Sequence, residues 1–361
     1  MESYHPHDEN PGSGGRCIPL PEGTSLRRRY TVRRVTGYDD CSIRYDGFDF
    51  KARQPVSILE FFPQRLAMRA LPHGTVSPVN RESGALFFLG SEAFLTQYSA
   101  LTQAIGSPSI ISVFDAFFEN GTAYAITEQP EGLTLGEYLR MRGRALTQGE
   151  LAYVANALSD ALLIVHSLNT LHHDITAGHI LLCTDGTVKL TDFSAAHETV
   201  RRGRDVAMRE PFEDIRALGK TLCQAFTGAA HSGGTPRRGA EISDTLRLMF
   251  ERMLTDNAAL RFSSVFDLRY AVGSLDVIPE RPSVTAAQIA DFRSAQRIAA
   301  VQALQHRRQT EQPEAAGASG RHSPPSGRSK AAKSRLLAFG IGALLIALVA
   351  TLIVFLIPKP S

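Results

Sequence analysis

The order of hydrophobic patterns along the chain restricts its fold more strongly than any other feature of the sequence. Runs of strand length, in which apolar residues alternate or cluster, lie between Tyr30 and Thr127. One helical pattern around Ser91–Ala104 interrupts them, and helical patterns dominate after Thr127. This order predicts an α+β chain, in which a lobe of five strands and one helix precedes a mostly helical lobe over residues 128–273.

Turn and cap signals support these boundaries. Asn-Gly and Asp-Gly dipeptides supply the positive φ angles of tight hairpin turns. A threonine followed three residues later by Glu or Gln forms a capping box at a helix start. The sequence contains such turns at Asn120-Gly121 and Asp185-Gly186, and such boxes at Thr134/Glu137, Thr147/Glu150 and Thr285/Gln288. The second box predicts a long helix to about Leu168, and the third a helix to about Gln305.

The composition is that of an ordinary globular chain, with 43% hydrophobic and 21% charged residues among 361. A net charge of +3 is too small to indicate nucleic-acid binding. The four cysteines (Cys17, Cys41, Cys183 and Cys223) form no CxxC pair, so we expect reduced thiols in a cytosolic domain.

The segment Leu336–Ile357 contains 22 residues without a charge. A helix of this length rises about 33 Å, enough to cross a bilayer. Its apolar character on every side favours a membrane span over a buried core helix. Five basic residues lie between Arg321 and Arg335, and only Lys359 follows the span, so the positive-inside rule places the preceding domain in the cytoplasm.

This pattern predicts a single-pass protein with a C-terminal anchor. The basic run before the span also suits contact with anionic lipid headgroups. Ala338 and Gly342 form a small-xxx-small pair that suggests homo-association through the span, although small residues are common in membrane helices.

Several motifs in the folded part occur in the order typical of one family. "PVSILEFFP", starting at Pro55, resembles the V-A-I-K-E-Y-F-P strand of bacterial Ser/Thr protein kinases. "HHDITAGH", from His172, resembles the kinase catalytic loop, and "TDFS", from Thr191, resembles the D-F-G motif. The resemblance covers roughly residues 28–273 and implies a bilobal protein-kinase fold. It also implies ATP with Mg²⁺ or Mn²⁺ as cofactors and protein partners in signalling, whose identity the sequence does not name.

The phosphate-binding motifs implied by this resemblance are degraded. Where the family has G-x-G-x-x-G, this chain keeps Gly37 but has Asp39 and Ser42 at the other glycine positions. Side chains there hinder close approach of the backbone to phosphate. A plain acidic β-turn is the alternative interpretation of this stretch.

The third-strand lysine position is occupied by Leu59, and Gln97 is aligned with the helix glutamate that normally pairs the lysine. Leu59 is therefore expected to pack in the core. A substitute cation would have to come from Arg33, Arg34 or Arg44, and the sequence does not place these side chains.

The catalytic loop keeps Asp174 at the position of the catalytic base, whose alternative role is a structural hydrogen-bond acceptor. His173, Thr176 and His179 replace the family's arginine, lysine and metal-binding asparagine. Histidine is a poor ligand for Mg²⁺, which prefers oxygen. A zinc site built from the loop histidines and Asp174 is the less favoured alternative.

Other family positions are better preserved. By the resemblance, Asp192 keeps the metal-binding carboxylate and Phe193 the apolar spine residue, whereas Ser194 replaces glycine at the hinge of the motif. Thr127 falls at the gatekeeper position, and Glu128 begins the hinge between the lobes.

The substrate-docking segment is shortened and lacks a convincing A-P-E motif. Asp214 matches the aspartate of the helix that follows this segment. Arg261 matches the arginine that normally pairs the missing glutamate, so its partner is open.

Three functions remain open. The first is a membrane-anchored pseudokinase that acts as a scaffold or regulatory binding module. The second is a switch that binds nucleotide without turnover, and the third an atypical Ser/Thr protein kinase that uses Asp174 and Asp192. The expected organisation is a disordered N-terminal tail (1–27), a kinase-like domain (28–275), a juxtamembrane helical segment (276–305), a flexible basic linker (306–334), a membrane helix (335–358) and a short tail (359–361).

Overall fold

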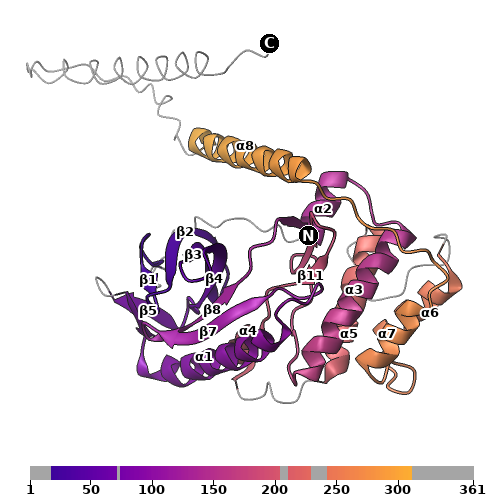
Figure 1. Ribbon diagram of the computed structural model, residues 1–361, viewed down its shortest axis with the longest axis horizontal. Coiled ribbons are helices and arrows are strands. Elements are labelled where there is room, and N and C mark those ends of the chain that lie inside the picture. The colour runs from indigo at the N-terminus through magenta and orange to yellow at the C-terminus, as the bar shows by residue number, and fades with distance from the viewer. Residues whose placement is uncertain (1–17, 71–73, 204–209, 229–241, 311–361) are drawn as a thin grey trace, which may run out of the picture. The chain divides into compact units, whose positions relative to one another are not determined.

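The computed structural model describes residues 18–70, 74–203, 210–228 and 242–310 (Figure 1). The chain divides into two compact units, Met1–Ala300 and Val301–Ser361. Within the described residues, no helix is both long enough and apolar enough to cross a membrane. The span expected at Leu336–Ile357, residues 311–334 of the expected linker and residues 1–17 of the N-terminal tail lie outside the described residues. Residues 306–310 belong to the helix α8 (Ala286–Thr310), and residues 18–27 contain the strand β1 (Ser25–Leu26) with Leu20 and Leu26 buried. The predicted linker and the predicted disordered tail are therefore wrong over these residues.

The N-lobe is built on a six-stranded sheet with the order β1-β2-β3-β4-β8-β7. The strands are β1 (Ser25–Leu26), β2 (Tyr30–Tyr38), β3 (Ser42–Asp49), β4 (Gln54–Phe61), β7 (Val113–Glu119) and β8 (Thr122–Thr127). All pairings are antiparallel. The predicted tight turn between β7 and β8 is confirmed, since Asn120 and Gly121 have φ angles of 49° and 76°.

The described N-lobe contains more strands than the five predicted, since β1 raises the main sheet to six strands and a further hairpin adds two. A separate hairpin, β5 (Ala67–Ala70) and β6 (Thr75–Pro78), lies between β4 and the first helix. The helix itself, α1 (Arg81–Leu101), begins ten residues before the predicted Ser91, because the Asn80 side chain accepts a hydrogen bond from the Ser83 amide and caps it there. The short 3₁₀ turn Thr102–Ala104 follows it.

The C-lobe is mostly helical, as predicted. Its elements are β9 (Gly132–Thr134), α2 (Leu135–Arg142), α3 (Gln148–Ser167), β10 (Ile180–Cys183), β11 (Val188–Leu190), α4 (Ala195–Arg202), α5 (Pro211–Thr227), α6 (Asp244–Leu254) and α7 (Val265–Gly273). The capping boxes predicted for α2 and α3 are confirmed, and α3 ends one residue before Leu168. The Asp185-Gly186 turn joins β10 and β11 as predicted.

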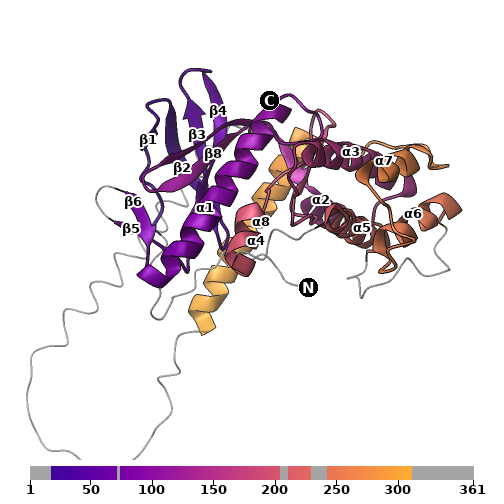
Figure 2. The ribbon, with the colours of Figure 1, turned by 90° about the horizontal axis from the view of Figure 1, so that it is seen from below.

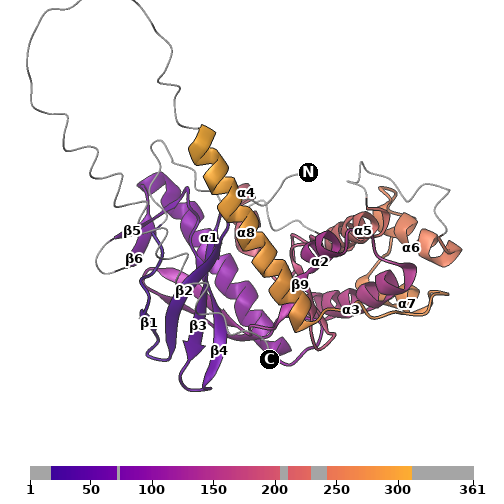
Figure 3. The ribbon, with the colours of Figure 1, turned by 90° about the horizontal axis from the view of Figure 1, so that it is seen from above.

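Helix α4 packs along α1, beside the N-lobe sheet (Figures 1 and 2). The close approach depends on Gly90 of α1, where a Cβ atom would lie 2.7 Å from the Phe61 ring and 3.0 Å from Val200. The segment that follows the D-F-G-like motif is thereby held against the N-lobe. Helices α3, α5, α6 and α7 form the body of the C-lobe away from this contact (Figure 3).

The chain after α7 continues along the C-lobe. The Glu280 amide donates to the Gly149 carbonyl at 2.9 Å, and Arg281 donates to the Thr184 carbonyl at 3.3 Å. Val284 and Ile289 are buried, with 6% and 1% of their surface exposed. The Thr285/Gln288 box is confirmed at the start of α8 (Ala286–Thr310), so the expected juxtamembrane segment begins as a packed part of the first compact unit.

Candidate functional site: a kinase-like cleft crossed by ion pairs

Among the described residues, a cation reaches the D-F-G-like motif from a strand different from the usual one. Leu59 on β4 is 7% exposed and belongs to the hydrophobic core, as expected. Directly opposite it in the β3–β4 register lies Arg44. The Arg44 guanidinium forms an ion pair with the Asp192 carboxylate in the D-F-G-like motif. Of the three candidate arginines, the structure therefore places Arg44 in the cleft.

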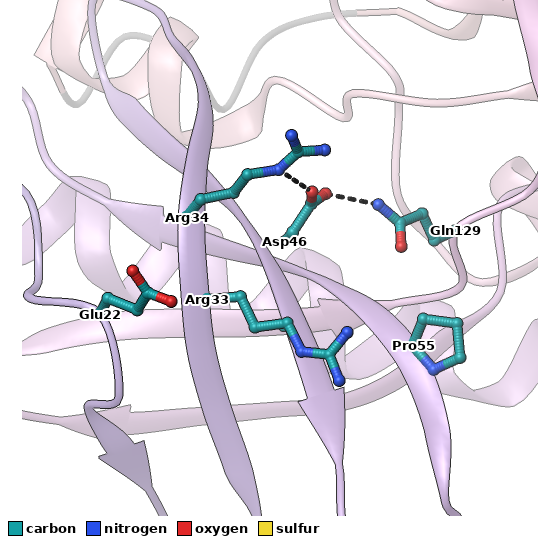
Figure 4. Close-up of a pocket in the computed structure, with 7 residues that line it drawn as sticks. Glu22, Arg33, Arg34, Asp46, Pro55 and Gln129 are labelled. Atoms are coloured by element: carbon teal, nitrogen blue, oxygen red, sulfur yellow. Dashed lines mark hydrogen bonds and ion pairs between the residues drawn. The ribbon is translucent and has the colours of Figure 1, made fainter. Parts of the chain in front are cut away.

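The other two candidates face a different surface. Arg33 and Arg34 line a cavity of about 380 Å³ together with Glu22, Asp46, Gly47, Pro55 and Gln129 (Figure 4). Asp46 accepts from Arg34 at 2.6 Å and from Gln129 at 2.5 Å. Arg33 stacks over the Phe48 ring at 4.8 Å.

Asp192 is held in a left-handed backbone conformation, with φ of 58°. One carboxylate oxygen pairs with Arg44, and the other accepts from the Thr191 hydroxyl at 3.1 Å. The side chain expected to bind a cation is thus already neutralised by a protein cation. The hinge of the motif is also bonded, because the Ser194 hydroxyl donates to the Asp192 carbonyl at 3.1 Å.

The backbone of the catalytic loop is held in place by a buried carboxylate of helix α5. Asp214 on α5, 2% exposed, accepts the amides of His172 at 2.8 Å and His173 at 3.0 Å. His166 approaches the same carboxylate at 3.0 Å. Although burial raises the pKa of Asp214, the hydrogen bond from His166 and the loop amides lower it below its usual value. This arrangement confirms the placement of Asp214 on the helix after the shortened segment.

His172 acts as a structural histidine of the loop. It is fully buried, its Nε2 lies 2.7 Å from the Thr191 carbonyl, and its Nδ1 accepts from the Asp174 amide at 3.2 Å. Burial lowers its pKa to about 4, so the neutral tautomer with a proton on Nε2 satisfies both bonds. Its ring packs 4.7 Å from that of Phe193, as expected for the apolar spine.

Asp174, at the base position, has 48% of its side chain exposed. His179 lies beside it, with Nδ1 2.7 Å from the Asp174 carbonyl and 3.6 Å from its carboxylate. With Nδ1 turned toward the loop backbone, His179 steadies the loop. Among the described residues, no group of three or more His, Cys, Asp or Glu side chains is placed to hold a metal ion.

Gln97 is buried, with 2% of its surface exposed, and both ends of its amide are used by the backbone. Its nitrogen donates to the Leu171 carbonyl at 2.7 Å, and its oxygen accepts from the Ala195 amide at 2.9 Å. The structure thus places the Gln97 amide on the catalytic loop and on α4, where it ties helix α1 to the C-lobe.

The degraded phosphate loop is closed onto the C-lobe. Asp39 accepts the amides of Cys41 at 2.8 Å and Ser42 at 2.6 Å, which makes the acidic turn self-capped. The same carboxylate contacts Nε2 of His197 on α4 at 2.9 Å. Burial opposes ionisation of Asp39, but the His197 contact and these hydrogen bonds lower its pKa to about 2. Despite burial, the pKa of His197 is raised by Asp39, with smaller contributions from Asp174 and Asp40.

The hinge is tied to the C-lobe by a cation that sequence reasoning missed. Thr127 is 4% exposed, at the end of β8. Glu128 accepts from the Ser112 amide at 2.7 Å and pairs with Lys189 of β11 at 2.8 Å. Lys189 is itself nearly buried and also donates to the Ser107 carbonyl at 3.0 Å. The sequence signal for this contact is a lysine inside a strand of three residues, because a lysine in a buried strand needs a partner of opposite charge.

The open partner of Arg261 is found in the shortened segment. Arg261 pairs with Glu210 at 2.6 Å and stacks over the Phe212 ring at 4.6 Å. Glu210 is the residue immediately before α5, so an acid close to the helix replaces the missing A-P-E glutamate.

The comparisons with known proteins agree with this geometry. Residues 89–211 match the sequence model of the family described as protein tyrosine and serine/threonine kinase. The structure titled "PpkA-294 apo form" has a TM-score of 0.58 and 22% identity, and the match covers 70% of this chain and 99% of that one. The Mycobacterium tuberculosis PknI kinase domain has a TM-score of 0.53 and 20% identity, with 71% and 98% covered. The chain is therefore similar to protein kinases in sequence over residues 89–211, and its bilobal fold is similar to that of these two solved structures.

Proposed function

We propose that this chain is a membrane-anchored, cytoplasmic-facing pseudokinase that acts as a scaffold or regulatory binding module in signalling. The observation that carries this proposal is the Arg44–Asp192 ion pair beneath Leu59. The cation and the metal-binding carboxylate that would face a nucleotide satisfy each other, and the usual lysine position is apolar. A cleft of this kind retains the kinase scaffold without a prepared site for triphosphate.

Two internal contacts oppose nucleotide entry. ATP with Mg²⁺ would have to draw Asp192 away from Arg44 before the metal could use the carboxylate. Its phosphates would then meet Asp39, an ionised group that is bonded to His197 and to its own turn. Loss of a single transition-state contact costs a few kcal/mol, so losing several lowers the transfer rate by many powers of ten.

One observation favours an atypical Ser/Thr kinase as a second function. Arg44 enters the cleft from β3, and a rotation of its side chain away from Asp192 would present a guanidinium to phosphate in place of the missing lysine. Asp174 remains exposed at the base position. In this alternative, Arg44 is the phosphate-binding cation and Asp192 becomes free to hold a metal ion.

A thermal-stability experiment separates these functions. The full-length protein in detergent is heated with and without ATP, Mg²⁺ and Mn²⁺, because any ligand of the native state raises the midpoint by mass action. A scaffold gives no shift and no phosphate transfer. A shift without transfer identifies a nucleotide-responsive switch. Transfer that is abolished by Asp174→Asn and by Arg44→Met identifies the kinase and rejects the proposal.

Arg34→Met is the matched control for Arg44→Met. Arg34 lies on the adjacent strand β2 and pairs with Asp46 at the outer cavity, so its loss removes an equal charge outside the cleft. An effect on nucleotide binding that is shared by both variants would indicate general electrostatics and would reject a specific role for Arg44.

Membrane anchoring rests on the uncharged segment 336–357 and is tested separately. Deletion of residues 336–361 should move the protein from the membrane fraction to the soluble fraction. Deletion of residues 1–17, which leaves the expected span intact, is the control and should have no such effect. A chain that stays in the membrane fraction without residues 336–361 would reject the anchor.

A further inference from the structure

Two turns meet at one end of the N-lobe sheet and form a single surface. One is the turn between β1 and β2 at residues 27–29, and the other is the turn between β3 and β4 at residues 50–53. The Phe50 amide donates to the Arg29 carbonyl at 3.0 Å, so the two turns are directly bonded. We call the surface formed by Arg28, Phe50, Lys51 and Arg53 the N-lobe tip.

A buried carboxylate fixes the shape of this tip. Asp49 is fully buried and accepts two hydrogen bonds from Arg29, at 3.0 and 2.6 Å. It also accepts the amides of Lys51 at 2.8 Å and Ala52 at 3.1 Å. The hydrogen bonds from Arg29 outweigh burial and lower the pKa of Asp49, which therefore stays ionised at neutral pH. The tip is held in one conformation before any partner arrives.

The side chains of the N-lobe tip are exposed to solvent. Arg28, Lys51 and Arg53 are exposed and make no ion pair within the part of the chain that the structure describes. Phe50 has 62% of its surface exposed and meets only the edge of the Phe48 ring, at 5.2 Å. The tip therefore combines three exposed cations with an exposed aromatic ring.

The neighbouring cation Arg27 behaves differently. Its amide donates to Glu119 at 2.8 Å, its guanidinium lies 3.5 Å from Asp115, and it stacks over the Phe117 ring. Arg27 therefore stabilises the sheet, whereas Arg28, Lys51 and Arg53 are exposed at the N-lobe tip.

We propose that the N-lobe tip docks on anionic lipid headgroups of the membrane to which the chain is tethered. This inference builds on the anchor under Proposed function. Basic side chains gain attraction at an anionic surface, and an aromatic ring between them inserts at the headgroup level. The part of the expected linker that follows α8, residues 311–334, would extend roughly 27 Å as a Gly/Ser-type coil, which brings the domain within reach of the bilayer.

Lipid fits the tip better than an acidic protein does. An interface with a protein needs a broad complementary surface with satisfied hydrogen bonds, whereas a bilayer accepts a small protruding tip of cations and one aromatic ring. The basic run between Arg321 and Arg335 places further positive charge beside the same expected span. Together these groups orient the kinase-like domain relative to the membrane.

A tryptophan probe tests the docking directly, because the chain contains no tryptophan of its own. Full-length Phe50→Trp protein is mixed with vesicles of phosphatidylcholine alone or with 30% phosphatidylserine, both containing brominated lipid. We expect quenching with the anionic vesicles and little with the neutral ones. Phe266→Trp, at a C-lobe position that is 67% exposed, is the matched control and should remain unquenched in both.

A second experiment removes the three positive charges of the N-lobe tip. In the Phe50→Trp background, Arg28→Gln, Lys51→Gln and Arg53→Gln together should weaken the apparent lipid affinity of the tip roughly 100-fold. Equal quenching in neutral and anionic vesicles, no quenching at all, or no effect of the three changes would overturn the proposal; an acidic-protein site would give the second result.

Flotation of the same samples on a density gradient measures independently whether the expected membrane anchor holds the chain on vesicles. If the chain fails to float with neutral vesicles, the anchor proposal fails, while flotation and quenching with anionic vesicles still decide the role of the tip.

Discussion

The fully buried ion pair between Arg69 and Glu60 provides the most quantitative prediction. Neither side chain has any exposed surface, and their charged atoms lie 2.6 Å apart. Glu60 also accepts the hydroxyls of Tyr45 at 2.6 Å and Tyr124 at 2.5 Å. The remaining Arg69 donors reach the backbone carbonyls of the N-terminal segment and of the β5–β6 turn, at 2.7 and 2.6 Å. Every charge in this network has a partner.

Removing one member leaves the other charge buried and uncompensated. We expect Arg69→Met or Glu60→Gln to lower the free energy of unfolding by about 3–5 kcal/mol. Typical domains have only about 5–15 kcal/mol in total. The double change Glu60→Gln with Arg69→Met leaves no buried charge, so it should cost much less than the sum of the single changes.

The assay is urea unfolding of the detergent-solubilised protein, followed by circular dichroism. Asp46→Asn is the control, because Asp46 pairs with Arg34 in a bridge whose arginine is 74% exposed. That change should cost at most about 1 kcal/mol. Single changes at Glu60 and Arg69 below about 1 kcal/mol, or additive effects in the double variant, would refute the reasoning.

Three further predictions follow from the geometry. The pKa of His172 is about 4 in the fold and 6.5 in an unfolded chain, so the unfolded chain takes up a proton first as the pH falls. Between pH 6.5 and pH 4, the free energy of unfolding of the wild type should fall by about 3 kcal/mol relative to that of His172→Gln, measured by urea unfolding. Asp39 raises the pKa of His197, so the Asp39–His197 pair stabilises the fold fully below pH 6.5 and loses this contribution as the pH rises. His197→Gln should therefore lower the free energy of unfolding more at pH 6 than at pH 9. A Cβ atom at Gly149 would lie 2.7 Å from that of Glu280, so Gly149→Val should raise hydrogen exchange over residues 276–285. Gly84→Val, where the added Cβ atom would meet Pro78 at an ordinary 3.9 Å, is the control and should leave that exchange unchanged.

Hydrophobic periodicity and local signals were sufficient to predict much of the fold. The change from strand to helix patterns predicted the two lobes, because apolar residues repeat every second position in a half-buried strand and about every 3.6 positions in a helix. Caps and turn dipeptides predicted the starts of α2, α3 and α8 and both hairpin turns, because these signals act within four residues. The β5–β6 hairpin was missed, since its short strands carry Arg69 among apolar positions and are stabilised by bonds to the distant carbonyls of Ile18 and Asn120.

The residue types of the candidate site were also readable from the sequence. Leu59 lies on a strand and Asp214 on a helix, as predicted, whereas the roles of Asp174 and Asp192 stay predictions. Gln97 was predicted in the helix, but its bonds to the loop backbone were not, because side-chain direction on a helix depends on how that helix packs.

The sequence by itself determined that the chain has a kinase-like scaffold, that its lysine position is apolar, and that its glycine loop is acidic. Only the tertiary structure decided which arginine enters the cleft and what closes it. Arg33, Arg34 and Arg44 are indistinguishable by charge, and alternation along strands does not say which cross-lobe partner each one meets. The Arg44–Asp192 and Asp39–His197 pairs join residues about 150 positions apart, so they exist only once the two lobes have come together.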